Sequence, residues 1–143
     1  MELGLRKRLA LEAFRLYRRN ETREHPLTYL FWECTLRCNL RCLHCGSDCV
    51  ADAIPDMPLE TFLAALDKLA PHVDPERFIV AITGGEPLMR PDLEECGRAI
   101  RDRGFSWGMV SNGWAMTPER LRRLLDAGLR SLTVSLDGLR ESH

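Results

Sequence analysis

The sequence has almost no excess of charge of either sign. Its 20 basic and 21 acidic residues leave a formal net charge of -1, which argues against attraction of the whole surface to nucleic acid or anionic lipid. It also lacks a long hydrophobic run, because no uninterrupted apolar segment follows the basic N-terminal stretch. We therefore expect no signal peptide, no transmembrane helix, and neither a nucleic-acid nor a membrane partner.

Cysteine is the residue type that the chain does have in an unusual distribution. There are six cysteines, and all but Cys96 lie between Cys34 and Cys49. Without an export signal we expect a cytoplasmic protein, where thiols stay reduced and a disulfide framework is disfavoured. The cluster of thiols therefore predicts metal or iron-sulfur binding.

The first part of the chain is predicted to be a helical segment separate from the rest. Apolar residues recur at helical spacing from Leu3 to about Arg19, and His25 and Pro26 break this pattern. We assign residues 1–26 to this amphipathic helix and its lead-in. Two interpretations stay open: a solvated helix that covers one end of the domain, or a contact with lipid or peptide.

Residues 27–143 are predicted to alternate strands with helices. Their apolar runs look buried on both faces, and helices separate them, which is typical of a parallel sheet. The expected strands are Leu27–Glu33, Phe78–Thr83, Phe105–Val110 and Leu132–Leu136, and the expected helices are Leu59–Leu69, Asp92–Arg103 and Pro118–Ala127. The fold class is thus α/β, a partial TIM-like (β/α) barrel of about three and a half β/α units after the N-terminal helix.

A full barrel of eight units needs about 250 residues. Half a barrel leaves its last strand as an apolar edge without a neighbour. We therefore expect either a truncated piece of a longer protein or self-association through the open sheet edge.

Every unusual motif falls directly after one of the predicted strands. The carboxyl ends of parallel strands meet at one edge of the sheet, where ligands bind in barrels and open sheets alike. In strand order, the motifs are the cysteine cluster, Gly84-Gly85-Glu86-Pro87, Ser111-Asn112-Gly113 and Asp137-Gly138. The sequence therefore predicts one ligand site at this edge.

Three of the cysteines have a spacing that suits an iron-sulfur cluster. Cys38, Cys42 and Cys45 are separated by three and two residues, and closely spaced cysteines of this kind hold such clusters. A set of three leaves one iron without a protein ligand, so that this iron can bind a substrate or cofactor.

The Cys-x3-Cys-x2-Cys loop followed by Gly-Gly-Glu-Pro resembles the radical S-adenosylmethionine (radical SAM) superfamily. The segment from Trp32-Glu33-Cys34-Thr35 through His44-Cys45 is similar to members that carry a SPASM domain. The resemblance implies that Cys38, Cys42 and Cys45 ligate three irons of a 4Fe-4S cluster and that S-adenosylmethionine chelates the fourth. Gly84, Gly85 and Glu86 then receive the ammonium group of its methionine part, for which a carboxylate supplies opposite charge.

Four further residues are candidates by resemblance. Ser111 and Asn112 resemble polar positions near the cofactor, and Ser135 and Asp137 resemble positions that bind ribose hydroxyls. Ordinary turn capping is the alternative for all four. His44 is not assigned as a ligand.

The remaining cysteines have other expected roles. Cys34 and Cys96 are interpreted as buried small apolar side chains, since cysteine packs well in cores. Cys49 either touches substrate or has no role in the site.

The resemblance implies an enzyme that cleaves S-adenosylmethionine reductively and uses the 5'-deoxyadenosyl radical for hydrogen abstraction, with no catalytic side chain required. Its expected partners are an electron donor such as flavodoxin or ferredoxin and a peptide or protein substrate in a maturation reaction. Two alternatives stay open. One is a truncated, catalytically inactive fragment that binds the cluster and S-adenosylmethionine, and the other is a structural zinc-binding module.

Overall fold

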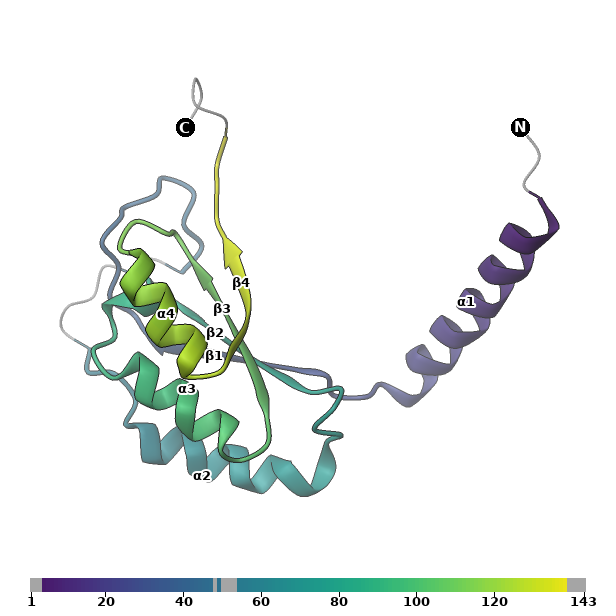
Figure 1. Ribbon diagram of the computed structural model, residues 1–143, viewed down its shortest axis with the longest axis horizontal. Helices are drawn as coiled ribbons and strands as arrows, with labels where there is room; N and C mark the ends of the chain where they lie inside the picture. The colour runs from purple at the N-terminus through teal and green to yellow at the C-terminus, as the bar shows by residue number, and fades with distance from the viewer. Residues whose placement is uncertain (1–3, 48, 50–53, 139–143) are drawn as a thin grey trace.

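The computed structural model describes residues 4–47, 49 and 54–138, and a parallel sheet forms its centre (Figure 1). The four strands are hydrogen-bonded in the order β1-β2-β3-β4, and each pair is parallel. The elements are α1 (Leu5–Glu24), β1 (Tyr29–Thr35), α2 (Leu59–Leu69), the 3-10 helix η1 (Ala70–His72), β2 (Ile79–Gly84), the 3-10 helix η2 (Pro87–Met89), α3 (Leu93–Arg101), β3 (Ser106–Ser111), α4 (Pro118–Asp126) and β4 (Leu129–Val134). The predicted α/β partial barrel is confirmed.

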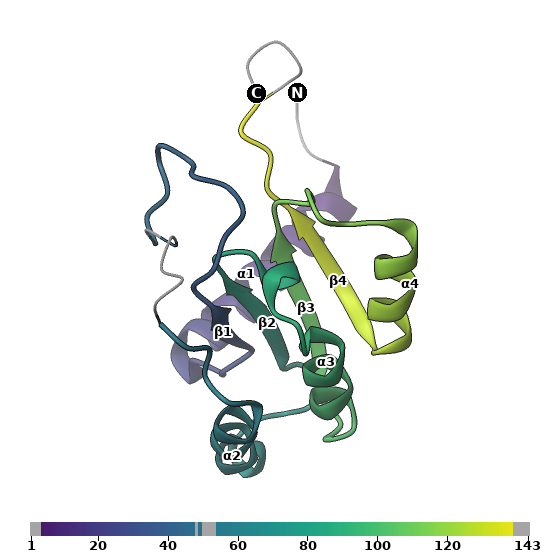
Figure 2. The ribbon, with the colours of Figure 1, turned by 90° about the vertical axis from the view of Figure 1, so that its left-hand side faces the viewer.

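The core lies between one face of the sheet and helices α2, α3 and α4. Figure 2 shows these helices along the same side of the strands. Val80, Ile82 and Trp107 of the sheet are fully buried in a cluster with side chains of all three helices. The other face is open, since Tyr29 and Phe31 of β1 point to that face and remain exposed. The prediction that the strands are buried on both faces is therefore wrong, because all three crossover helices cover the same face.

Helix α1 projects away from the sheet (Figure 1). It contacts the domain through Arg77, whose Nη2 donates to Glu21 Oε1 at 2.9 Å and to Tyr17 Oη at 3.4 Å. The helix runs to Glu24, beyond the predicted end near Arg19, where side-chain pairs such as Asn20 with Glu24 support its last turn, and it ends at His25, whose φ is positive. None of the described helices is long and apolar enough to cross a bilayer. The division at residue 26 stays a prediction.

The last strand begins earlier than predicted. Strand β4 covers Leu129–Val134 rather than Leu132–Leu136. Gly128 ends the preceding turn at a positive φ of 98°, and Leu129 then enters the core directly beside Trp107. The apolar pattern did not indicate this start, because the second and third residues of the strand, Arg130 and Ser131, are polar and exposed.

The packing of α3 against β3 gives a first test of the core. A Cβ atom added at Gly97 would lie 2.3 Å from a ring carbon of Trp107, which is fully buried. Overpacking of this kind costs roughly 1–3 kcal/mol. We expect Gly97→Ala to lower the free energy of unfolding by about 2 kcal/mol in urea denaturation. The matched control is Gly4→Ala, where an added Cβ meets nothing within 4 Å, and an equal effect of both substitutions would contradict the packing.

Candidate functional site

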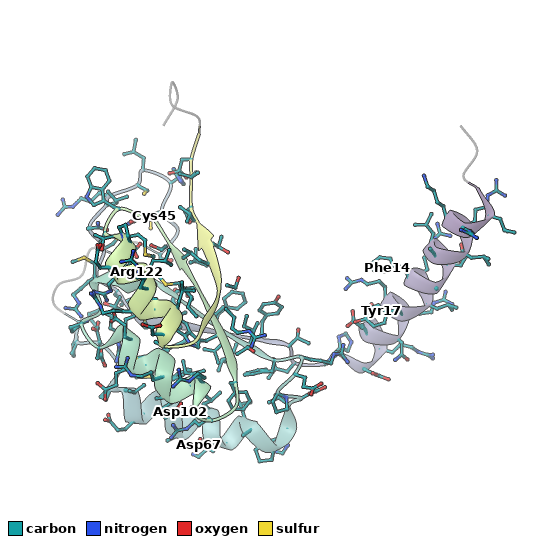
Figure 3. All side chains as sticks on the ribbon, viewed as in Figure 1. Phe14, Tyr17, Cys45, Asp67, Asp102 and Arg122 are labelled. Atoms are coloured by element: carbon teal, nitrogen blue, oxygen red, sulfur yellow. The ribbon has the colours of Figure 1, made fainter. Side chains whose placement is uncertain are left out.

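A cavity of about 720 Å³ lies at the carboxyl ends of the strands. Figure 3 shows Cys45 at this end of the sheet, with Asp67 and Asp102 at the opposite end. The predicted site residues that line the cavity are Cys38, Cys42, Cys45, Gly84, Gly85, Ser111, Asn112, Ser135 and Asp137. Glu86 is the predicted site residue that is not among the lining residues. The fold therefore brings motifs from four separate strand ends into one hollow.

The cysteine loop that follows β1 forms one wall of this cavity. The side chain of Cys38 is half-buried, and Cys42 and Cys45 are exposed toward the hollow. The amide of Leu40 donates to Cys38 Sγ at 3.5 Å, and the amide of Cys45 donates to the Cys42 carbonyl at 3.1 Å. Among the described residues, no group of three or more His, Cys, Asp or Glu side chains is arranged to hold a single metal ion.

The glycine turn after β2 lies directly against the cysteine loop. The amide of Gly85 donates to the Thr35 carbonyl at 2.9 Å, and the amide of Glu86 donates to the Arg37 carbonyl at 2.8 Å. Gly84 has a φ of 122°, which L side chains rarely adopt. A Cβ added at Gly84 would lie 2.2 Å from the Thr35 oxygen, and one added at Gly85 would lie 2.2 Å from the Arg37 oxygen. Both positions therefore need glycine so that the two backbones can touch.

This close approach predicts the effect of a single methyl group. Gly85→Ala places its Cβ against backbone atoms, which cannot rotate away as a side chain can. We expect the cysteine loop to move from β2 and the iron content after anaerobic reconstitution to fall about tenfold, since site geometry tolerates only small displacements. Gly46→Ala is the control within the loop, because an added Cβ there meets nothing within 4 Å. Equal iron content in the two variants would contradict the argument.

The carboxylate of Glu86 is buried and has three hydrogen-bond donors. Its Oε1 accepts from the Leu88 amide at 3.0 Å and from Ser111 Oγ at 2.8 Å, and its Oε2 accepts from the Asn112 amide at 2.7 Å. Glu86 is 0% exposed. Burial and these three donors hold the carboxylate behind the cavity wall, and its contact with a ligand's ammonium group stays a prediction. Glu86 joins the turn after β2 to the end of β3.

The polar residues after β3 serve the turn and the cavity together. Ser111 Oγ accepts from the Gly113 amide at 2.9 Å, and Asn112 Oδ1 accepts from the Trp114 amide at 2.9 Å. Asn112 Nδ2 also donates to Asn39 Oδ1 in the cysteine loop at 2.9 Å. Turn capping is therefore present, and the same residues line the hollow.

The end of β4 closes the far side of the cavity. The amide of Ser135 donates to the Ser111 carbonyl at 3.0 Å, so this residue continues the pairing with β3. Asp137 Oδ1 lies 3.1 Å from His44 Nε2, and both side chains are exposed. The cysteine loop is thus linked to the last strand as well as to β2 and β3.

The cysteines outside the three-residue motif differ in their surroundings. Cys34 and Cys96 are fully buried, as predicted, and burial raises the pKa of each thiol to about 12. Both thiols therefore stay protonated near neutral pH. Because a thiol binds metal as the thiolate, neither cysteine is a candidate ligand. Cys49 is also buried but lines the cavity, and its pKa is raised chiefly by burial and then by the neighbouring Cys45.

Sequence reasoning missed two residues that build the site. Asn39 lies inside the cysteine motif, and a polar residue in a loop gave no specific signal. Arg90 is 2% exposed and donates to the Cys34 and Met57 carbonyls. Its position in the apolar segment Pro87-Leu88-Met89-Arg90-Pro91 was the available signal, since arginine is rarely buried without partners.

Comparisons with known proteins place these features in a wider group. An AdoMet-dependent heme synthase of Methanosarcina barkeri is 38% identical over 109 residues, which cover 75% of this chain and 30% of that protein. A tungsten-containing aldehyde ferredoxin oxidoreductase cofactor-modifying protein of Pyrococcus furiosus is 35% identical over 114 residues, covering 79% of this chain and 32% of that protein. The chain thus spans about a third of the length of these curated relatives.

A solved structure has the same fold. Streptococcus suis SuiB bound to the precursor peptide SuiA superposes with a TM-score of 0.66 at 16% identity, covering 98% of this chain and 32% of that one. The family model described as the Radical SAM superfamily matches residues 32–143. Since that match takes in most of the sheet, the cysteine loop and the glycine turn, the chain belongs to the Radical SAM superfamily.

Proposed function

We propose that this chain forms the cofactor-binding part of a radical SAM enzyme. In this proposal Cys38, Cys42 and Cys45 hold a 4Fe-4S cluster, and S-adenosylmethionine lies beside it. The observation that carries the proposal is that all three thiols and the ends of the other strands line one and the same cavity. The superfamily uses both cofactors.

The donor set of the cavity suits these two cofactors. Soft thiolate ligands select iron-sulfur clusters among the possible metal groups. The cavity volume of about 720 Å³ lies in the range of small-molecule and cofactor sites. With both cofactors bound, the cluster would pass one electron from an external donor to S-adenosylmethionine, and the pair would supply the radical chemistry that removes hydrogen from a substrate.

The protein's own groups bind and orient. Gly84 and Gly85 line the cavity, and their carbonyls are the proposed acceptors for the methionine ammonium group. Glu86 contributes indirectly by holding Ser111 and Asn112 at the wall. Ser135 and Asp137 are the proposed partners of ribose hydroxyls, because both lie on the wall formed by the end of β4.

Two classes of substrate are candidates for this site. A peptide or protein substrate is supported by the fold shared with SuiB, which was solved with a precursor peptide. The heme synthase and the cofactor-modifying protein support a second candidate, a precursor of a metal-containing cofactor. An electron donor such as flavodoxin or ferredoxin is part of either reaction.

The test is anaerobic reconstitution of the chain with iron and sulfide, followed by reduction in the presence of S-adenosylmethionine. We expect about four irons and four sulfides per chain and release of 5'-deoxyadenosine. Stoichiometric zinc without sulfide would instead establish the structural zinc module. A cluster with no 5'-deoxyadenosine under any reductant would establish the catalytically inactive fragment.

A further inference from the structure

The guanidinium of Arg90 lies buried between β1 and the start of α3. Its side chain is 3% exposed, and burial of a charge is costly unless its donors are satisfied. Arg90 follows η2 and comes two residues before Asp92, the residue that precedes α3. This location is outside the cavity, because Arg90 is not among the lining residues.

The donors of Arg90 reach both ends of the cysteine loop. Nη1 donates to the Cys34 carbonyl at 2.6 Å and to the Met57 carbonyl at 3.0 Å. Cys34 lies near the end of β1, where the pairing register with β2 shifts, and Met57 lies two residues before α2 begins. One guanidinium thus joins the residues at which the loop leaves β1 and approaches α2.

Two further contacts fix the orientation of this guanidinium. Nε and Nη2 donate to the two carboxylate oxygens of Asp92 at 2.8 and 3.0 Å. The guanidinium carbon also lies 5.0 Å from the centre of the Trp32 ring, and Trp32 stacks on Phe62 of α2. Burial raises the pKa of Asp92, but the hydrogen bonds from Arg90, the positive charge of its guanidinium and smaller hydrogen-bond contributions together lower that pKa below its ordinary value.

A second pair closes the loop one step nearer to the cysteines. Arg37 forms an ion pair with Asp56, and the Arg37 amide donates to Thr35 Oγ1 at 3.1 Å. The Arg37 carbonyl is the group that accepts from the Glu86 amide. The Arg37–Asp56 pair therefore joins the two residues that flank the loop 38–55, directly outside the first cysteine of the motif.

We propose that Arg90, together with the Arg37–Asp56 pair, is a positioning residue that holds the two ends of the cysteine loop closed against β2. Because the loop ends are already joined in the folded chain, binding of a cluster costs less conformational entropy of the loop. Lysine cannot replace the arginine, since its single ammonium lacks the planar fork that serves two carbonyls and a carboxylate together. The link to cluster assembly rests on the proposed function, whereas loop closure does not.

The test uses the 143-residue chain and the variants Arg90→Lys and Asp56→Asn. The matched control is Arg103→Lys, which alters an ion pair with Asp67 between α2 and the end of α3. Amide hydrogen exchange of the metal-free protein reports on closure, because the Gly85 and Glu86 amides donate to the carbonyls of Thr35 and Arg37, where the chain leaves β1 and enters the cysteine loop. The Met109 amide in β3 reports on the sheet as a whole.

We expect Arg90→Lys to speed exchange at Gly85 and Glu86 about tenfold, as loss of charged hydrogen bonds implies, with Met109 unchanged. Asp56→Asn should give a smaller change in the same direction, and it stands as the test of closure if Arg90→Lys does not fold. Arg103→Lys should change neither amide. Equal acceleration at all amides would mean that Arg90 only stabilises the fold, and would overturn the proposal.

Cluster loading separates this inference from the proposed function. If the unsubstituted chain binds no iron and sulfide, the proposed function fails, and hydrogen exchange still decides loop closure. If it loads a cluster, Arg90→Lys should retain less than half of the iron under the same conditions. Full loading together with unchanged exchange in Arg90→Lys would refute the positioning role.

Discussion

Replacement of Cys38, Cys42 or Cys45 by alanine is expected to abolish the 4Fe-4S cluster. Each thiolate is the proposed ligand of a different iron, so the loss of one leaves a second iron without a protein ligand. We expect iron per chain to fall from about four to background, together with the visible absorption of the cluster and all release of 5'-deoxyadenosine. Iron and sulfide assays after anaerobic reconstitution measure the effect.

The matched control is Cys96→Ala, which removes a thiol that α3 places in the hydrophobic core of the domain. Its iron content should equal that of the unsubstituted chain, although its stability will fall slightly because a buried side chain becomes smaller. Cys49→Ala tests whether the fourth thiol in the cavity contributes. Retention of a full cluster in any of the three motif variants would contradict the ligand assignment.

Replacement of Glu86 by alanine is expected to have the largest effect on stability. Three donors, the Leu88 and Asn112 amides and the Ser111 hydroxyl, lose their acceptor in a buried place. Leaving a buried donor unsatisfied costs roughly 1–3 kcal/mol. We therefore expect the free energy of unfolding in urea to fall by at least about 3 kcal/mol.

Two variants sharpen this experiment. Glu86→Gln keeps one carbonyl oxygen but brings an NH2 group toward the remaining donors, so we expect an intermediate loss. Glu95→Ala is the control, because Glu95 belongs to α3 and is exposed. A loss for Glu86→Ala no greater than for Glu95→Ala would show that the carboxylate does not join the two turns.

The architecture was predictable because strong local signals marked its elements. Helix α2 was predicted with its observed bounds, and Thr117 caps α4 as expected, its hydroxyl accepting from the Arg120 amide at 3.1 Å. Whether helices cover one face of the sheet or both was not predictable from the same signals. An apolar run such as that of β1 looks alike whether helices cover one face or both, and only the common side of α2, α3 and α4 decides it.

The cavity was predictable for a topological reason. Parallel strands end at one edge, so the motifs after β1, β2, β3 and β4 had to meet there. The orientation of individual side chains was not predictable in this way. Glu86 stands beside two cavity glycines in the sequence, yet its carboxylate accepts hydrogen bonds from Ser111 and Asn112 at the end of the neighbouring strand β3.

The order of the strands has a consequence for how the chain folds as it is synthesised. Each strand pairs with the one before it in the sequence, so no strand must be inserted between two that have already paired. The ribosome can therefore release the sheet one βα unit at a time, in keeping with the tendency of N-terminal parts to fold first. Both flanks of the cysteine loop, together with Arg90, emerge before β3 is made. The two ends of the cysteine loop can therefore be joined while the second half of the sheet is still being translated, and the cavity walls formed by the ends of β3 and β4 are added afterwards.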